Sequence, residues 1–189
     1  MGPWALNRFS NAVTQGAVFG YPTDTIWGFG CHPLIASSVS RILQIKNRRA
    51  DKGLILLSSQ LEYCEPYIDV ATAQLQTISS PVSNPTTWLV NASAACPVWL
   101  RGQHPTIAIR ITNHPFVRSL CDRLGSPIVS TSANRAGKST VRNLIQLRKQ
   151  FSAELDFIIA GYDSGSGRQS EIKFLASGKT LRYSANRGK

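Results

Sequence analysis

Short apolar segments alternate along the chain with longer stretches in which apolar residues recur every three or four positions. The short segments are bounded by glycine, proline or asparagine, which is typical of strands. The longer stretches are typical of amphipathic helices. We expect strands at 17–21, 54–57, 86–90, 106–111, 127–129, 157–159, 171–175 and 180–183. We expect helices at 4–15, 35–46, 116–124 and 140–151, and two short helices within 59–79, the second capped by Asp69.

Strands and helix-length segments are mixed along all 189 residues. Several strands are separated by a segment long enough to form a helix, so the pattern predicts an α/β fold with one open, twisted, mixed sheet. The length suits one full-sized domain with its own core, and no internal repeat or low-complexity linker divides it. We therefore expect a single domain over 1–189, with a loop rich in glycine and serine at 161–168 and a frayed basic tail at 184–189.

Residues 21–30 read Tyr-Pro-Thr-Asp-Thr-Ile-Trp-Gly-Phe-Gly and are expected to connect a strand to a helix. Pro22 cannot donate a hydrogen bond to a sheet, so the strand should end there. Thr23, Asp24 and Thr25 then place two hydroxyls and a carboxylate at the carboxyl end of a strand, where open α/β sheets bind ligands. The segment is therefore either one wall of a ligand site or a turn whose hydroxyls only cap backbone groups.

The net charge of the chain indicates which classes of molecule it could bind. The chain carries 21 Lys and Arg against 10 Asp and Glu, which gives a formal net charge of +11. A surplus of this size favours polyanionic partners such as nucleotide phosphates or RNA, although a charge spread around the surface for solubility gives the same total.

The cysteines lie far apart, and no CxxC or Cys/His spacing predicts a metal site. The start of the chain lacks the pattern of a secretory signal, and no apolar run approaches the length of a membrane span. These features predict reduced, mostly buried thiols in a cytoplasmic protein that does not enter membranes. The thiols are those of Cys31, Cys64, Cys96 and Cys121.

A basic cluster follows the helix expected at 35–46. It consists of Lys46, Arg48, Arg49 and Lys52. Cations suit the negative end of a helix dipole, so a structural role is one interpretation. Four cations within seven residues exceed what capping needs and would repel one another, so phosphate binding is the other interpretation.

Two further features could carry chemistry. The segment 130–134 reads Ser-Thr-Ser-Ala-Asn directly after a strand, and its backbone N–H groups could form an anion nest or its hydroxyls a helix N-cap. Arg110 and Arg182 lie in or at the end of apolar strands, so each is either on a solvated face or paired in a site. No nucleophile-and-base arrangement, GxxxxGK[ST] loop or HxxE-type metal motif is present in the sequence. Any nucleotide chemistry should therefore depend on positioning and charge neutralisation.

Taken in order, these segments resemble the YrdC-like family, and most closely its short bacterial members. The resemblance covers about residues 7–184 and rests on five segments, at 21–30, 46–56, 108–110, 130–134 and 170–172. It implies an open α/β twisted sheet around a basic concave surface. Two departures are visible: Val82-Ser83-Asn84-Pro85 replaces the family's Trp-Pro-Gly-Pro, and the stretch before Ser170 is one residue shorter.

The resemblance implies an adenylate-forming enzyme, a nucleotidyltransferase. The family joins L-threonine, bicarbonate and ATP into threonylcarbamoyl-adenylate and releases pyrophosphate. Mg²⁺ would be carried with ATP. Downstream threonylcarbamoyl-transfer proteins would then modify the tRNA adenosine next to the anticodon. The alternative is a non-catalytic RNA-binding module that uses the same basic surface on tRNA, ribosomal RNA or other double-stranded RNA.

The resemblance also implies roles for individual residues. Pyrophosphate departure would be assisted by Lys46, Arg48 and Lys52. ATP would be bound by Arg48, Lys52, Thr106, Ser132, Thr140 and Arg182. Threonine would be bound by Thr25, Arg110, Ser130 and Ser170, with Arg110 holding its carboxylate. Thr23 and Asp24 would only shape the turn.

Overall fold

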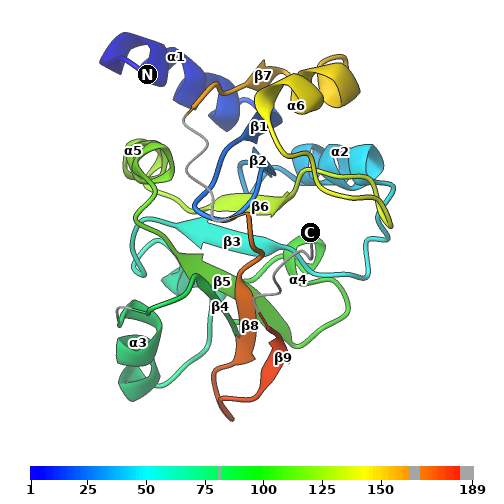
Figure 1. Ribbon diagram of the computed structural model, residues 1–189. Coiled ribbons are helices and arrows are strands. Elements are labelled where there is room, and N and C mark those ends of the chain that lie inside the picture. The colour runs from blue at the N-terminus through cyan, green and yellow to red at the C-terminus, as the bar shows by residue number, and fades with distance from the viewer. Residues whose placement is uncertain (81, 162–166, 184–189) are drawn as a thin grey trace.

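The computed structural model describes residues 1–80, 82–161 and 167–183. The strands of this part of the chain form one nine-stranded sheet in the order β7-β1-β2-β6-β3-β5-β4-β8-β9 (Figure 1). Their bounds are β1 Phe19–Tyr21, β2 Gly28–Cys31, β3 Ile55–Ser58, β4 Thr86–Asn91, β5 Thr106–Ile111, β6 Ile128–Ser132, β7 Phe157–Ile158, β8 Glu171–Phe174 and β9 Thr180–Arg182.

The sheet is mixed, as the sequence predicts. The pairs β1–β7, β3–β5 and β4–β8 are parallel. The other neighbours are antiparallel. The predicted α/β class with an open mixed sheet is therefore confirmed.

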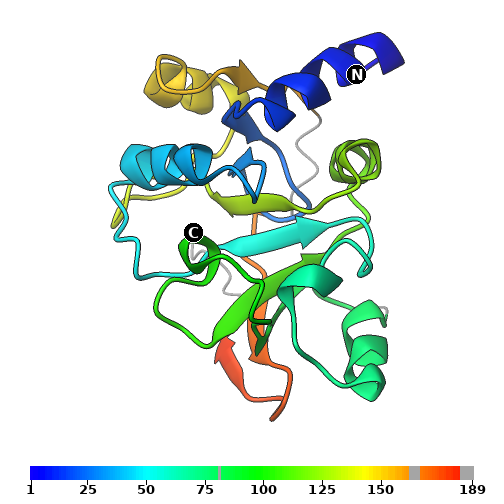
Figure 2. The ribbon, with the colours of Figure 1, turned by 180° about the vertical axis from the view of Figure 1, so that it is seen from behind.

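Helices cover both faces of the sheet. Their bounds are α1 Pro3–Thr14, α2 Ala36–Lys46, α3 Thr72–Ser79, α4 Val98–Arg101, α5 Pro115–Leu124 and α6 Leu144–Phe151, with a 3₁₀ turn at Glu65–Tyr67. Helices α1 and α5 pack together on one face. Helices α2, α3 and α4 lie on the other face, which is turned toward the viewer in Figure 2.

Successive residues of a strand point to opposite faces, and this alternation divides the core. Leu57 of β3 and Ile128 of β6 belong to the apolar cluster under α1 and α5. Leu56 and Val129, one residue away on the same strands, belong to the larger cluster on the other face. Arg110 pairs in register with Leu57, so it projects from the face that α1 and α5 partly cover.

The expected strand-to-helix connection at 21–30 is wrong. Gly28–Cys31 is a strand, β2, which pairs antiparallel with β1, so residues 22–27 connect a hairpin. The strand was missed because it contains two glycines, which weaken the apolar pattern. A side chain at Gly30 would come within 2.6 Å of the Phe19 ring, so glycine is what lets this strand lie close to that ring.

Other differences are local. Asp69 does not cap α3, because the helix begins at Thr72 after Ala71, whose N–H donates to the Gln74 side chain (3.3 Å). Helix α6 begins four residues later than expected, at Leu144, because Asn143 caps it by accepting from Gln146 N (2.9 Å). Helix α4 was not predicted. The tail at 184–189 and most of the loop at 161–168 lie outside the described residues.

Candidate functional site

The connection between β1 and β2 is shaped by a threonine hydroxyl. Thr23 Oγ1 accepts from the backbone N–H groups of Thr25 (3.0 Å) and Ile26 (3.2 Å) and donates to the Ile26 carbonyl (2.7 Å). The Thr23 and Thr25 hydroxyls also lie 2.9 Å apart. Both side chains are buried, so the connection has a fixed shape that presents Thr25 to the sheet.

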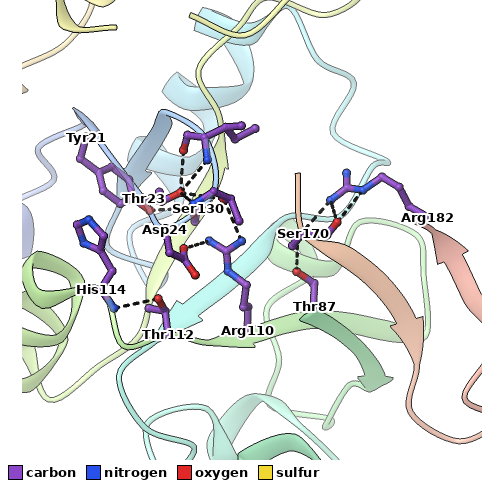
Figure 3. Close-up of polar contacts among 12 residues, drawn as sticks. Tyr21, Thr23, Asp24, Thr87, Arg110, Thr112, His114, Ser130, Ser170 and Arg182 are labelled. Carbon is purple, nitrogen blue, oxygen red and sulfur yellow. Dashed lines mark hydrogen bonds and ion pairs between the residues drawn. The ribbon is translucent and has the colours of Figure 1, made fainter. Parts of the chain in front are cut away.

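Arg110 of β5 reaches this connection from the neighbouring part of the sheet (Figure 3). Its Nη1 donates to Thr25 Oγ1 (3.2 Å), and its Nη2 forms an ion pair with Asp24 Oδ1 (3.1 Å). Arg110 is 4% exposed, and its Nε has no hydrogen-bond partner among the described residues. The sequence left Arg110 either solvated or paired, and the structure shows that it is paired.

Asp24 therefore does more than shape the turn, which corrects the sequence interpretation. Its carboxylate compensates a buried guanidinium 86 positions away along the chain. Nothing in the local pattern could indicate this pair, since only the sheet topology brings the two residues together.

Ser130 and Ser132 are residues of β6 itself rather than of a loop after it. Ser130 Oγ accepts a hydrogen bond from the Tyr21 hydroxyl (2.7 Å), and burial raises the pKa of Tyr21 far above its usual range. Tyr21 thus stays protonated and acts as a donor that orients Ser130. Ser132 Oγ donates to Asn134 Oδ1 (2.6 Å).

A second cluster lies where β4, β8 and β9 meet. Thr87 Oγ1 and Ser170 Oγ are 2.8 Å apart (Figure 3). Arg182 donates through Nε (3.1 Å) and Nη2 (2.9 Å) to the Ser170 carbonyl. Burial, and then the charge of Arg110, lower the pKa of Arg182. The two arginines are thus close enough to repel each other, and an anion between them would relieve that repulsion.

The basic segment after α2 contains one half-buried and two exposed cations. Arg48 donates to the Gly53 carbonyl (2.8 Å), and its buried Nε has no hydrogen-bond partner in the described part of the chain. Burial lowers its pKa. Arg49 instead pairs with Asp51 (2.9 Å) with 81% of its side chain exposed. Lys52 is exposed as well.

Lys46 is buried at the end of α2. Its Nζ donates to the Ser132 carbonyl, to the Asn134 carbonyl (3.0 Å) and to Asn134 Oδ1 (3.0 Å). Burial, and then the nearby charge of Arg48, lower the pKa of Lys46 to about 7.

One cavity of about 170 Å³ joins most of these groups. Its lining includes seven of the residues predicted for the site: Thr25, Arg48, Arg110, Ser130, Ser132, Ser170 and Arg182. Four predicted residues do not line it: Lys46, Lys52, Thr106 and Thr140. Lys46 and Thr140 are buried, whereas Thr106 starts β5 four residues before Arg110.

Ser170 lines the cavity although the stretch before it is shortened. The lining also includes residues for which no individual role is predicted, among them Thr131, Gln169 and Ile172. Thr87, the partner of Ser170, was also missed. It is one of two threonines at the start of β4, and nothing in the sequence distinguishes it from Thr86.

Metal and thiol chemistry have few candidate groups. The described residues contain no group of three His, Cys, Asp or Glu side chains that could hold a metal ion. The four cysteines are free and buried, as predicted. No helix within the described ranges is long and apolar enough to cross a membrane.

The fold and the cavity define an α/β protein with an arginine-lined cavity, whose charge suits a small anionic ligand. A family model for Sua5/YciO/YrdC proteins, described as "Telomere recombination", matches residues 11–183. A threonylcarbamoyl-AMP synthase of Cellvibrio japonicus is 38% identical over 186 residues, which cover 96% of this chain and 98% of that protein. A second protein of the same name, from Pseudomonas fluorescens Pf-5, is 37% identical over 182 residues, with the same coverage of 96% and 98%. The chain belongs to the Sua5/YciO/YrdC family.

Solved structures agree on the fold. Sua5 of P. abyssi complexed with L-threonine superposes with a TM-score of 0.87 at 24% identity, over 95% of this chain and 53% of that one. This chain therefore spans about half the length of that Sua5. E. coli YciO superposes with a TM-score of 0.81 at 21% identity, over 98% of this chain and 91% of that one. At these identities the likeness shows the fold alone.

Proposed function

We propose that this protein is a threonylcarbamoyl-AMP synthase, a cytoplasmic nucleotidyltransferase that makes threonylcarbamoyl-adenylate from L-threonine, bicarbonate and ATP. The observation that carries the proposal is the cavity in which Arg48, Arg110 and Arg182 converge. The near-complete match to relatives of that name supports it.

The three guanidinium groups are not equivalent, and the difference suggests two subsites. Arg110 is compensated by Asp24, so it suits the carboxylate of an amino acid whose overall charge is small. Arg48 and Arg182 have hydrogen bonds only to backbone carbonyls and a serine hydroxyl among the described residues. Neither forms an ion pair with a carboxylate in the described part of the chain, so their charge is available to phosphate groups.

The reaction requires positioning and charge neutralisation rather than a protein nucleophile. The threonine amine and CO₂ form a carbamate, and a carbamate oxygen then attacks the α-phosphorus of ATP as the bond to pyrophosphate breaks. Arg110 would hold the threonine carboxylate, with Thr25, Ser130 and Ser170 around it. Arg48, with the exposed Lys52 near it, would stabilise the negative charge that grows on pyrophosphate.

The remaining groups complete the proposal. The nucleotide would be contacted by Thr106, Ser132, Thr140 and Arg182. The protein offers no cluster of carboxylates for a divalent ion within its described residues, so Mg²⁺ would arrive as part of the ATP substrate. The labile product would pass to transfer proteins that modify a tRNA adenosine.

The test measures pyrophosphate release with ATP, Mg²⁺, bicarbonate and each amino acid in turn. Release should require both bicarbonate and threonine. Release that is indifferent to both would refute the synthase and leave binding of RNA by the basic protein as the alternative. Arg48→Ala should lower the rate at least tenfold, about 1.4 kcal/mol of transition-state stabilisation. Arg49→Ala is the matched control, because Arg49 is exposed and paired with Asp51.

A further inference from the structure

Lys46 has no hydrogen-bonding capacity left for a ligand. A lysine ammonium has three N–H donors and no acceptor. Its three closest acceptors are the Ser132 carbonyl, the Asn134 carbonyl and Asn134 Oδ1, which together use all three donors. The side chain is 3% exposed and does not line the cavity. Arg48, two residues later, is the opposite case, because it lines the cavity and its Nε has no partner among the described residues.

The acceptors of Lys46 belong to Ser132, the last residue of β6, and to Asn134 in the turn that follows it. Asn134 holds this turn from inside, because its Nδ2 donates to the carbonyls of Arg135 (2.9 Å) and Lys138 (2.7 Å). The Ala136 N–H donates to the backbone carbonyl of Lys46 (2.6 Å). The end of α2 is therefore hydrogen-bonded to residues 132–138 through both the side chain and the backbone of Lys46.

The turn adjoins the cavity wall at Ser132 and, through a backbone hydrogen bond, at Trp27. Ser132 lines the cavity and donates its hydroxyl hydrogen to Asn134 Oδ1, the atom that Lys46 also holds. The Ala133 N–H donates to the carbonyl of Trp27, a lining residue at the end of the β1–β2 connection (2.8 Å). A shift of the turn would therefore move Ser132 and disturb the wall next to it.

We propose that Lys46 is a positioning residue that clamps the turn at 132–138 and so shapes the nucleotide side of the cavity, rather than a group that contacts phosphate. The identity of the ligand on that side rests on the proposed synthase function. The clamp itself does not, since it follows from the contacts of Lys46, Ser132 and Asn134.

The first test needs no ligand. Amide hydrogen exchange should be at least about tenfold faster for residues 133–138 in Lys46→Met than in the wild type, because an opening that costs 1.4 kcal/mol less is ten times more frequent. Lys149→Met makes the same substitution at an exposed position on α6 and should leave these rates unchanged. Unchanged exchange in Lys46→Met would overturn the proposal.

The second test is a double-mutant cycle on the dissociation constant of ATP. Lys46→Met and Asn134→Ala should each weaken binding by about tenfold, and the double variant should be no more than about threefold weaker than the worse single variant. Losses that multiply would show that Lys46 reaches the nucleotide independently of Asn134, which would overturn the clamp. If Lys46→Met does not fold, Asn134→Ala alone must still speed exchange at 133–138 and weaken ATP, or the proposal is wrong.

Kinetics separate positioning from charge neutralisation and from a loss of folded protein. As a positioning residue, Lys46 should affect the KM for ATP by about tenfold and leave kcat and the KM for threonine within about twofold. A fall in kcat with unchanged KM values would instead indicate a transition-state contact or a smaller active fraction. Failure of the synthase function would be seen separately, as absence of threonine-dependent pyrophosphate release by the wild type.

Discussion

The replacement Asp24→Ala should destabilise the folded protein substantially, because it leaves a buried guanidinium with less compensation. Arg110 has 5% of its side chain exposed, whereas the Asp24 side chain is 28% exposed. Breaking a fully buried pair costs about 3–5 kcal/mol, and leaving one buried donor unsatisfied costs about 1–3 kcal/mol. Since water reaches part of Asp24, we expect a loss of about 2 kcal/mol. For a chain of 189 residues this corresponds to a fall in Tm of roughly 4–8 °C.

Urea denaturation and thermal unfolding measure this loss, and Asp51→Ala is a matched control. Asp51 has 29% of its side chain exposed, nearly the same as Asp24, but its partner Arg49 is 81% exposed. An exposed pair contributes about 0–1 kcal/mol, so the control should change stability by less than about 0.5 kcal/mol. The two variants thus differ mainly in the burial of the cation left behind.

A third variant isolates the cause. Arg110→Met/Asp24→Ala should recover at least about half of the loss, because it removes the buried charge together with its partner. Equal effects of Asp24→Ala and Asp51→Ala would refute the reasoning. The reasoning would also be refuted if the double variant lost as much stability as Asp24→Ala and Arg110→Met lose separately, added together.

Three other outcomes are expected. Thr25→Val should raise the KM for threonine by about tenfold, since it removes the hydroxyl that Arg110 Nη1 contacts, and steady-state kinetics would show this. Gly102→Ala should cost more than about 2 kcal/mol in urea denaturation, because Gly102 has φ +65° and a new Cβ would lie 2.3 Å from the Asp51 carbonyl oxygen. The pKa of Lys46 is about 7 in the folded protein, below its usual value of about 10.4. The unfolded chain therefore binds the extra proton between these values, and the stability of the wild type relative to Lys46→Met should rise by up to about 1.4 kcal/mol per pH unit from pH 7 to 9. Lys149→Met should show no such change.

The sequence predicted most elements because local patterns determine them. Strand β5 was placed at its observed bounds, and α1, α2 and α5 to within one or two residues. Strand β2 was missed because its glycines reflect a tertiary requirement, the close approach of Gly30 to Phe19. Such a requirement produces no periodic signal in the strand that contains it.

For the site, the sequence indicated residue types but not their partners. The structure places seven of the residues implied by the resemblance on one cavity, yet the resemblance could not show that Asp24 compensates Arg110 or that Lys46 points into a turn. The first relation joins residues 86 positions apart and the second joins residues 88 positions apart, which only the order of strands brings together. In the sequence, the cations of the cluster at 46–52 cannot be told apart. In the structure they differ, because Lys46 is buried with all its donors used, Arg48 is half-buried with an Nε that has no partner among the described residues, and Lys52 is exposed.

The register of the sheet explains why the cavity is polar where it is. Along β6, Ile128, Ser130 and Ser132 point to the same face, since they are two residues apart. Ile128 lies in the apolar cluster with α1 and α5, whereas the two serines line the cavity. The same face of one strand thus changes from core to site within five residues. A slip of one residue would exchange Ser130 for Val129 and expose an apolar side chain to the cavity. The pattern that packs Ile128 into the core under α1 and α5 is therefore also the pattern that places the hydroxyls of Ser130 and Ser132 at the cavity, so packing and site lining in β6 depend on the same register.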